Sequence, residues 1–182
     1  MTEPKDSALV KECLAGNTKA FEFIIDRYQK PIFNVALRMV NDYEDAQDVT
    51  QAVFVKAFEK LDTFKPKFKF FSWIYRMVIN ESINFINQKK QVDKLDRAFL
   101  SKAKTPEQNY LDIELREKIQ KALMDLPIDY RVVIILRHFE ELSYNEMSYI
   151  LKIPEKTVKS RLFTARQNLR NILLKKGIVT HD

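Results

Sequence analysis

Apolar side chains recur three or four positions apart along most of this chain, and that spacing marks one face of an α-helix. The strict apolar–polar alternation of a half-buried strand is not found. The chain is therefore expected to be all-α. The pattern predicts helices over residues 6–15, 18–40, 42–61, 71–89, 105–124 and 129–139, followed by two more between 142 and 170.

One interruption of this pattern divides the helices into two groups. Residues 91–104 have few regularly spaced apolar positions and carry mixed charge, which favours a flexible linker. Thr105-Pro106 then predicts the start of a new helix, because threonine can cap a helix and proline suits its first position. We therefore expect two small helical bundles, 1–90 and 105–176, joined by the linker and followed by a tail at 177–182.

The segment 142–170 contains two helices separated by a tight turn. Ser143 can cap the first helix, and Glu146, three residues later, completes a capping box. Ile153-Pro154 ends that helix and starts the next, because proline cannot continue a helix but suits its first turn. This arrangement predicts a helix-turn-helix in the C-terminal bundle.

The second helix of this pair is strongly basic. Residues 152–176 contain eight lysines and arginines and one acid. A recognition helix needs such charge to approach DNA phosphates. A surface helix with a solvated charged face is the alternative interpretation. The capping box and the helix-breaking proline before the basic helix favour nucleic-acid binding instead.

Aromatic and basic residues are interleaved over residues 64–76, FKPKFKFFSWIYR. Aromatic rings stack on unpaired bases, while lysines hold the backbone of a single strand. Downstream, Arg76, Asn80 and Asn84 are four positions apart and share one helix face, from which amides can contact base edges. The aromatic residues could instead belong to the hydrophobic core, and the lysines to a solvated loop, so both interpretations stay open.

The predicted helix before this segment has the opposite charge. Residues 41–62 hold six acids and two lysines. Such a surface would repel DNA, so it is more plausibly a face that binds another protein. Some of the acids also favour a helix N-terminus, where the helix dipole stabilises negative charge.

The composition narrows the classes of function. The net charge of +6 suits a polyanionic partner. Cys13 is the only cysteine, which excludes an intramolecular disulfide and a cysteine-rich zinc site. The sequence has no glycine-rich phosphate loop, no secretory signal and no apolar run long enough to span a bilayer. We expect a cytoplasmic protein with no membrane insertion, no enzymatic activity, no metal, no cofactor and no small-molecule substrate.

Three segments, in this order, resemble a bacterial RNA polymerase sigma factor of the extracytoplasmic-function (ECF) group of the sigma-70 family. DAQDVTQAVFVKAFEKLDTF is similar to the core-polymerase-binding helix of that group, and FKFFSWIYRMVINESINFI to its promoter-melting helix. LPIDYRVVIILRHFEELSYNEMSYILKIPEKTVKSRLFTARQNLR is similar to its C-terminal promoter-binding domain. The resemblance implies a protein that binds core RNA polymerase, directs it to promoters and helps to melt the −10 element.

The resemblance also implies roles for particular residues. Residues 1–90 would bind polymerase and the −10 element, residues 105–176 would bind the −35 duplex and meet the β flap, and a cognate anti-sigma factor, often membrane-bound, would mask both. The expected contacts with the β′ clamp helices are Asp45, Asp48 and Gln51. The expected −10 contacts are Phe64, Lys65, Lys67, Lys69, Phe71, Trp73, Tyr75, Arg76, Asn80 and Asn84. The expected −35 contacts are Lys156, Thr157, Lys159, Ser160, Arg161, Phe163 and Arg166.

Some positions depart from the pattern of the group. Ala52 stands where an acid is usual, so one expected polymerase contact does not carry over. Lys65-Pro66-Lys67-Phe68 replaces a glycine-containing loop and Thr164 stands where arginine is frequent, so neither the −10 base preference nor the −35 sequence can be transferred. Lys152 stands where the turn usually has glycine, and a left-handed backbone there would cost lysine about 1 kcal/mol. Two other classes stay open: a stand-alone helix-turn-helix regulator, and an interaction protein that mimics a sigma factor and sequesters a partner.

Overall fold

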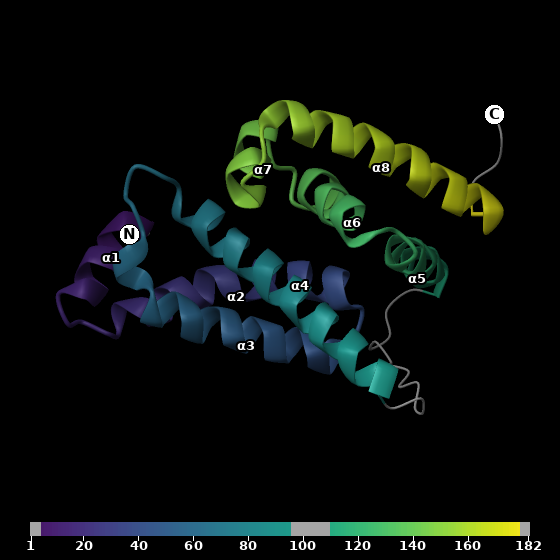
Figure 1. Cartoon of the computed structure of the whole chain (residues 1–182). Coiled ribbons are helices and arrows are strands. Elements are labelled where there is room, and N and C mark those ends of the chain that lie inside the picture. Colours follow the sequence, from purple (N-terminus) through teal and green to yellow (C-terminus); the bar gives the residue numbers. More distant parts are fainter. Residues whose placement is uncertain (1–4, 96–109, 179–182) are drawn as a thin grey trace.

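The computed structural model describes residues 5–95 and 110–178, and every regular element in these two ranges is helical (Figure 1). The predicted all-α class is thus confirmed. The elements are α1 (Asp6–Leu14), α2 (Ala20–Val40), α3 (Tyr43–Glu59), the 3₁₀ turn η1 (Leu61–Thr63), α4 (Phe70–Leu95), α5 (Tyr110–Met124), α6 (Ile128–Ile134), the π-helical turn η2 (Ile135–Phe139), α7 (Tyr144–Leu151) and α8 (Glu155–Lys175).

The first bundle is built from α1 to α4. Helix α2 packs along both α3 and α4, and α1 packs against α2. Its core includes Ile24, Ile32, Val53 and Ile74, which are fully buried and lie at positions where the helical spacing predicts an apolar face. Each such side chain contributes roughly 1.5–3 kcal/mol relative to exposure. Helix α2 continues through Pro31.

The predicted loop before α4 is shorter than expected, because η1 occupies its start and α4 begins at Phe70. An aromatic cluster closes the bundle behind the loop. The ring of Phe70 lies 5.5 Å from Tyr28, 5.3 Å from Phe64 and 5.3 Å from Trp73, measured between centroids. These are the offset and edge-on distances at which aromatic pairs attract. The cluster fixes where the loop leaves and rejoins the core.

The second bundle is built from α5 to α8. Helix α8 packs on α5, α6 and α7, and Val133, Leu136, Met147 and Leu162 form the centre of the core. The predicted helix 129–139 is divided: α6 ends at Ile134 and one π turn follows, in which the N–H of Glu140 donates to the carbonyl oxygen of Ile135.

The predicted helix-turn-helix is present. The backbone N–H of Glu146 donates to Ser143 Oγ at 3.2 Å, and the Glu146 carboxylate accepts from the backbone N–H of Ser143 at 3.0 Å, which is the predicted capping box. Lys152 ends α7 with a φ of 54°, the left-handed conformation expected at the glycine position of the turn. Pro154 then precedes the first residue of α8.

Helix α4 is longer than the predicted helix 71–89. It runs to Leu95, so the first five positions of the predicted linker 91–104 are helical. The sequence QVDKL lacks a long apolar stripe but contains good helix formers, whose propensity allows the helix to continue. The rest of the linker and the predicted helix start at Thr105-Pro106 lie outside the described residues.

The two bundles are in contact. Helix α4 packs on α7, and α2 meets α5 (Figure 1). Arg131 on α6 joins them: it donates to the carbonyl oxygens of Leu123 at 3.0 Å and Met124 at 2.8 Å, and its Nη1 donates to that of Met39 at 2.7 Å. The last carbonyls of a helix have no partner within the helix. One guanidinium therefore supplies donors to the ends of α5 and α2.

No helix within residues 5–95 and 110–178 is long and apolar enough to cross a membrane. The same residues contain no group of three or more histidine, cysteine, aspartate or glutamate side chains placed to hold a metal ion.

Candidate nucleic-acid interfaces

A hollow of about 480 Å³ lies along one face of α4. Trp73, Arg76, Asn80 and Asn84 line it, so the structure brings together four residues assigned to −10 recognition. Both asparagines are exposed, and each amide can donate and accept hydrogen bonds. Lys152, in the turn before α8, also lines the hollow. The volume lies within the range of about 300–1,000 Å³ that is common for ligand sites.

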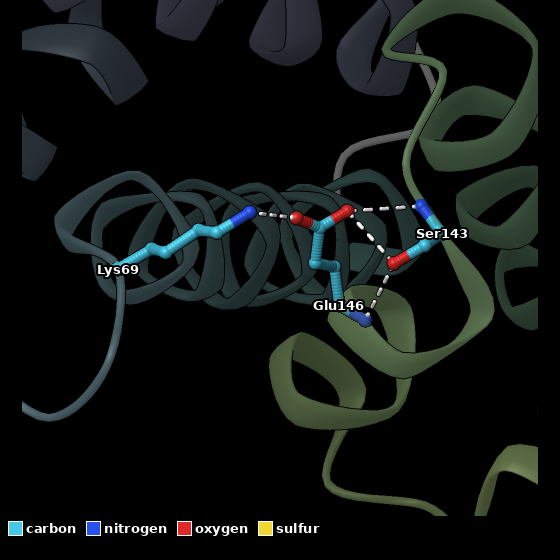
Figure 2. Close-up of polar contacts among 3 residues, drawn as sticks. All are labelled: Lys69, Ser143 and Glu146. Carbon is cyan, nitrogen blue, oxygen red and sulfur yellow. Dashed lines mark hydrogen bonds and ion pairs between the residues drawn. The ribbon is translucent and has the colours of Figure 1, made fainter.

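The loop before α4 presents its lysines to solvent. Lys65 and Lys67 are exposed, and the side chain of Lys69 is 71% exposed. The Nζ of Lys69 nevertheless donates to Glu146 on α7 at 2.8 Å (Figure 2). The loop is therefore a cationic segment directly before α4, with one of its charges engaged by the other bundle.

The aromatic residues of this region divide between the core and the surface. Phe64 and Trp73 are each 7% exposed, and their rings lie 5.8 Å apart, so the structure places them in the core. Phe71 is half-buried against Tyr75, with ring centroids 5.9 Å apart. Phe68, which belongs to the predicted loop but is not among the individually named −10 residues, is half-buried. Phe64 and Trp73 thus support the loop from inside.

Glu146 belongs to the helix-turn-helix and to the contact with the loop (Figure 2). One carboxylate oxygen accepts from the N–H and hydroxyl of Ser143, and the other accepts from Lys69. The hydrogen bond from Lys69 is the main reason that the pKa of Glu146 lies below its ordinary value, against the opposing effect of burial. The carboxylate that caps α7 is thus also the anion facing the loop.

Tyr75 is assigned to the −10 surface but its hydroxyl is turned toward the C-terminal bundle. Its side chain is 7% exposed, and the hydroxyl donates to Glu140 at 2.7 Å. Burial, followed by the hydrogen bond to Glu140, raises the pKa of Tyr75 well above its ordinary value. The phenol therefore remains a hydrogen-bond donor at neutral pH.

The outer face of α8 carries the predicted −35 residues. Lys156, Lys159, Ser160 and Phe163 are exposed, and Phe163 is 65% exposed, the largest value among the exposed large apolar side chains. Lys159 pairs with Glu155 at 2.7 Å, and that hydrogen bond raises the pKa of Lys159. The face is therefore cationic, and one ring projects from it.

Three other predicted −35 residues lie on the flanks of α8. Arg161 is held 3.6 Å from Asp129 at the start of α6, and Arg166 Nε donates to His138 Nε2 at 3.1 Å. Burial, followed by the charge of Arg166, lowers the pKa of His138, so this imidazole accepts in its neutral form. Thr157 is half-buried, and its carbonyl accepts from the Ser160 hydroxyl.

Helix α3 carries the predicted polymerase contacts. Asp48 and Gln51 are exposed, whereas the carboxylate of Asp45 pairs with Lys89 at 2.6 Å. One turn further along the same face, Val55 is 54% and Phe58 46% exposed. From the sequence, Phe58 was expected among the apolar residues of this helix, and Val55 was assigned no role. Val55 and Phe58 follow Gln51 by four and seven residues, so helical spacing could have placed them on the same face as Gln51.

Comparison with protein families is consistent with this arrangement. A model of sigma-70 region 2 matches residues 24–92, and a model of sigma-70 region 4 matches residues 116–169. The ECF RNA polymerase sigma factor SigW of Bacillus subtilis is 33% identical over 90% of this chain and 94% of its own length. The ECF RNA polymerase sigma-E factor of Escherichia coli K12 is 33% identical over 91% of this chain and 93% of its own.

The chain belongs to the extracytoplasmic-function sigma factors. As a sigma factor it directs RNA polymerase to promoters, and it is not an enzyme. The hypotheses of a stand-alone regulator and of a sequestering mimic lose their support, because both sigma-70 regions occur in one chain in the expected order.

Two solved complexes contain chains with a similar fold. The sigma factor RpoE of Bartonella quintana, solved with the anti-sigma factor NepR, has a TM-score of 0.72 and is 27% identical, covering 85% of this chain and 97% of that one. CnrH, solved with the cytosolic domain of CnrY, has a TM-score of 0.69 and is 23% identical, covering 92% of this chain and 96% of that one. This sigma factor thus shares the helical architecture of both.

Proposed function

We propose that the two bundles of this sigma factor divide promoter recognition, with residues 1–90 binding core polymerase and the −10 element and residues 105–176 binding the −35 duplex. One observation carries the −10 half: Arg76, Asn80 and Asn84 line a single hollow on α4, the helix that directly follows a lysine-rich loop. The experiment is run-off transcription with core RNA polymerase on promoter-containing fragments. A discrete start site that depends on this protein is expected, and duplex binding without any transcript would contradict it.

The hollow on α4 suits an unpaired base of the −10 element. A base taken out of the stack loses stacking and pairing, which costs a few kcal/mol. Hydrogen bonds from Asn80 and Asn84 to its edge, with Lys65 and Lys67 near the backbone phosphates, would offset that loss. These contacts become available after the strands separate, so they would stabilise the melted promoter rather than the duplex. Phe64 and Trp73 would hold the loop in place from the core.

Replacement of both asparagines, Asn80→Ala with Asn84→Ala, is expected to lower open-complex formation by about 10- to 100-fold, because two hydrogen bonds of roughly 1 kcal/mol or more are lost. Permanganate reactivity of the −10 thymines measures open-complex formation. Affinity for −35 duplex should not change. The matched control is Asn87→Ala, an exposed residue on the same helix that does not line the hollow. Equal losses in melting and duplex binding would refute the assignment.

The outer face of α8 suits the major groove of the −35 element. A recognition helix places a few side chains against base edges while neighbouring cations bind phosphates. Lys156, Lys159, Ser160 and Phe163 are exposed for this. Arg161, Arg166 and Thr157 lie toward the flanks, so we assign the two arginines to the phosphates that border the groove and Thr157 to support of the helix start.

Loss of the central contacts, Lys159→Ala with Phe163→Ala, is expected to weaken −35 duplex binding by roughly 10- to 100-fold. Because Lys159 is a cation, its loss should also reduce the dependence of binding on salt concentration by about one released ion. A titration of labelled duplex at several salt concentrations measures both. Lys175→Ala, at the far end of α8, is the control and should change affinity by less than about threefold. Unchanged affinity in the double variant would exclude this face.

We assign the exposed stripe of α3 to core polymerase. Asp48 and Gln51 lie on its outer face, and Val55 and Phe58 extend that face with apolar surface, which is typical of the centre of a protein interface. The β′ clamp helices are the expected partner of this stripe, and the β flap the expected partner of the C-terminal bundle. Asp45, paired with Lys89, would act at the edge.

We further propose that an anti-sigma factor, held at the membrane or free in the cytoplasm, controls this protein. The support is that RpoE of Bartonella quintana, with a similar fold, was solved with an anti-sigma factor. Capture of a partner encoded beside this gene, followed by loss of run-off transcription when that partner is added, would test the proposal. Transcription that is insensitive to every neighbouring gene product would count against it.

A further inference from the structure

The outer face of α8 carries one stripe whose three side chains differ in chemistry. Glu155, Lys159 and Phe163 follow one another at intervals of four residues, so they lie on the same side of the helix. The carboxylate of Glu155 is a hydrogen-bond acceptor and the ammonium of Lys159 is a donor, whereas the ring of Phe163, 65% exposed, is apolar. Lys159 and Phe163 were expected at the −35 element from the sequence, but Glu155 was assigned no contact there.

Two contacts hold the middle of this stripe in place. The ammonium of Lys159 donates to the Glu155 carboxylate at 2.7 Å, and it lies 5.3 Å from the centre of the Tyr144 ring at the start of α7. The side chains of Glu155 and Lys159 are still 42% and 54% exposed, so a partner can reach both. An exposed ion pair between neighbouring turns of a helix contributes little stability. A better partner can therefore replace either half of the pair.

The carboxylate of Glu155 can be explained in two ways. An acid in the first turn of a helix is stabilised by the helix dipole, and this explanation requires no DNA. If α8 enters the major groove, however, Glu155 faces the duplex together with Lys159, and every phosphate there repels it. The groups of a duplex that can donate to a carboxylate are the amino groups on the base edges. An acid at this place therefore selects among base pairs rather than adding general affinity.

We propose that Glu155 is a specificity-determining residue of this sigma factor, which selects a C·G pair in the −35 element by accepting a hydrogen bond from the N4 amino group of cytosine. This inference rests on the −35 assignment proposed above. Cytosine suits a carboxylate better than adenine does, because the amino group of adenine stands beside the N7 acceptor of the same base. Guanine and thymine present acceptors at this edge, and these repel a carboxylate.

The other two members of the stripe suit neighbouring bases by the same chemistry. Lys159 can donate to O6 and N7 of a guanine, and Phe163 can contact the methyl group of a thymine. Phe163 lies eight positions after Glu155, which is a rise of about 12 Å along an α-helix. Because successive base pairs are about 3.4 Å apart, the stripe covers roughly four pairs. A cytosine, a guanine and a thymine, on either strand, should therefore lie within that distance in the −35 element.

The ion pair between Glu155 and Lys159 makes this recognition selective. At the preferred site the carboxylate turns from Lys159 to the cytosine amino group, and the ammonium is released to the guanine. At any other site the pair stays closed, so Lys159 adds less to binding. Loss of the carboxylate should therefore raise the affinity for unrelated duplex. It should lower the ratio of specific to non-specific affinity by roughly 5- to 100-fold, the range of a single well-placed base contact.

The test is a binding selection with core RNA polymerase assembled with the full-length protein, either wild type or variant. The probe is a pool of duplexes that carry the promoter mapped by run-off transcription, with its −35 element randomised. We expect the wild type to select cytosine at one position and Glu155→Ala to lose that preference alone. Glu155→Gln should select adenine there, because a glutamine amide pairs with N6 and N7 of adenine. Identical base preferences in the wild type and Glu155→Ala would overturn the proposal, as would a wild-type preference for another base at the affected position.

Glu114→Gln is the matched control, because Glu114 forms the same kind of ion pair with Lys118, at 2.7 Å on α5, outside the proposed DNA face. Its base preferences should equal those of the wild type. A role of Glu155 in helix stability alone would lower the thermal midpoint of Glu155→Ala without changing any base preference. If Glu155→Ala does not fold, Glu155→Gln decides by the same selection, since the amide keeps the size of the side chain. Failure of the −35 assignment itself would show differently, as duplex binding that is insensitive to Lys159→Ala with Phe163→Ala.

Discussion

Asp48→Lys is expected to abolish most core-dependent transcription while leaving the fold and −35 duplex binding intact. Asp48 is exposed in the middle of α3 and forms no ion pair within residues 5–95 and 110–178, so its charge is available to a partner. An acid in a protein interface that is replaced by a cation changes attraction into repulsion, which costs about 2–5 kcal/mol. We therefore expect the affinity for core polymerase to fall by roughly 30- to 1,000-fold or more.

The measurement is a titration of core polymerase with labelled protein, followed by run-off transcription at each concentration. Asp26→Lys is the matched control, because it makes the same change of charge at an exposed position of α2. Transcription by the Asp48→Lys variant should recover at high protein concentration, since promoter recognition is unaffected. If Asp26→Lys lowers the affinity for core polymerase as much as Asp48→Lys does, then net charge rather than the α3 stripe governs polymerase binding.

Arg131→Met is expected to lower the free energy of unfolding by about 3 kcal/mol or more. The guanidinium donates to the carbonyl oxygens of Leu123, Met124, Leu126 and Met39, and methionine has nearly the same length but no donor. A hydrogen bond to a charged group contributes about 1.5–3 kcal/mol, and a buried acceptor left unpaired adds its own cost. The loss should loosen the end of α5 and the contact between the bundles.

Thermal unfolding followed by circular dichroism should show a midpoint lower by roughly 6–12 °C for a chain of this size. Arg170→Met, the control, removes an exposed arginine of α8, and its free energy of unfolding should stay within about 0.5 kcal/mol of that of the wild type. The unfolding midpoint of Arg131→Lys should lie between those of Arg131→Met and Arg170→Met, because a single ammonium cannot reproduce the planar array of donors of a guanidinium. An unchanged midpoint for Arg131→Met would show that these four hydrogen bonds contribute little in solution.

Both predictions rest on features that differ in how far the sequence specifies them. The stripe that contains Asp48 follows from helical spacing, so it could be predicted from the sequence. The role of Arg131 could not, because its acceptors lie five, seven, eight and 92 positions away. A residue placed in the middle of a helix gives no local signal of which carbonyl oxygens it will meet.

The aromatic segment shows the same limit. Its composition equally suits DNA stacking and a hydrophobic core, and both interpretations were open. The structure places Phe64 and Trp73 in the core and Phe68 on the loop, because a side chain's burial depends on which helices pack behind it. The sequence marked Arg161 and Lys159 alike as cations of α8, but Asp129 on α6 draws the first to the flank.

The sequence by itself determined most of the helices, the helix-turn-helix, its capping box and the resemblance to the family. These features depend on residues within about one or two helical turns of each other, where spacing and capping rules act directly. The tertiary structure decided which aromatic residues are core, which cations face outward and how α7 packs on α4. Those outcomes depend on contacts such as Lys69 with Glu146, 77 positions apart, for which no local pattern exists because packing of the whole chain selects the partners.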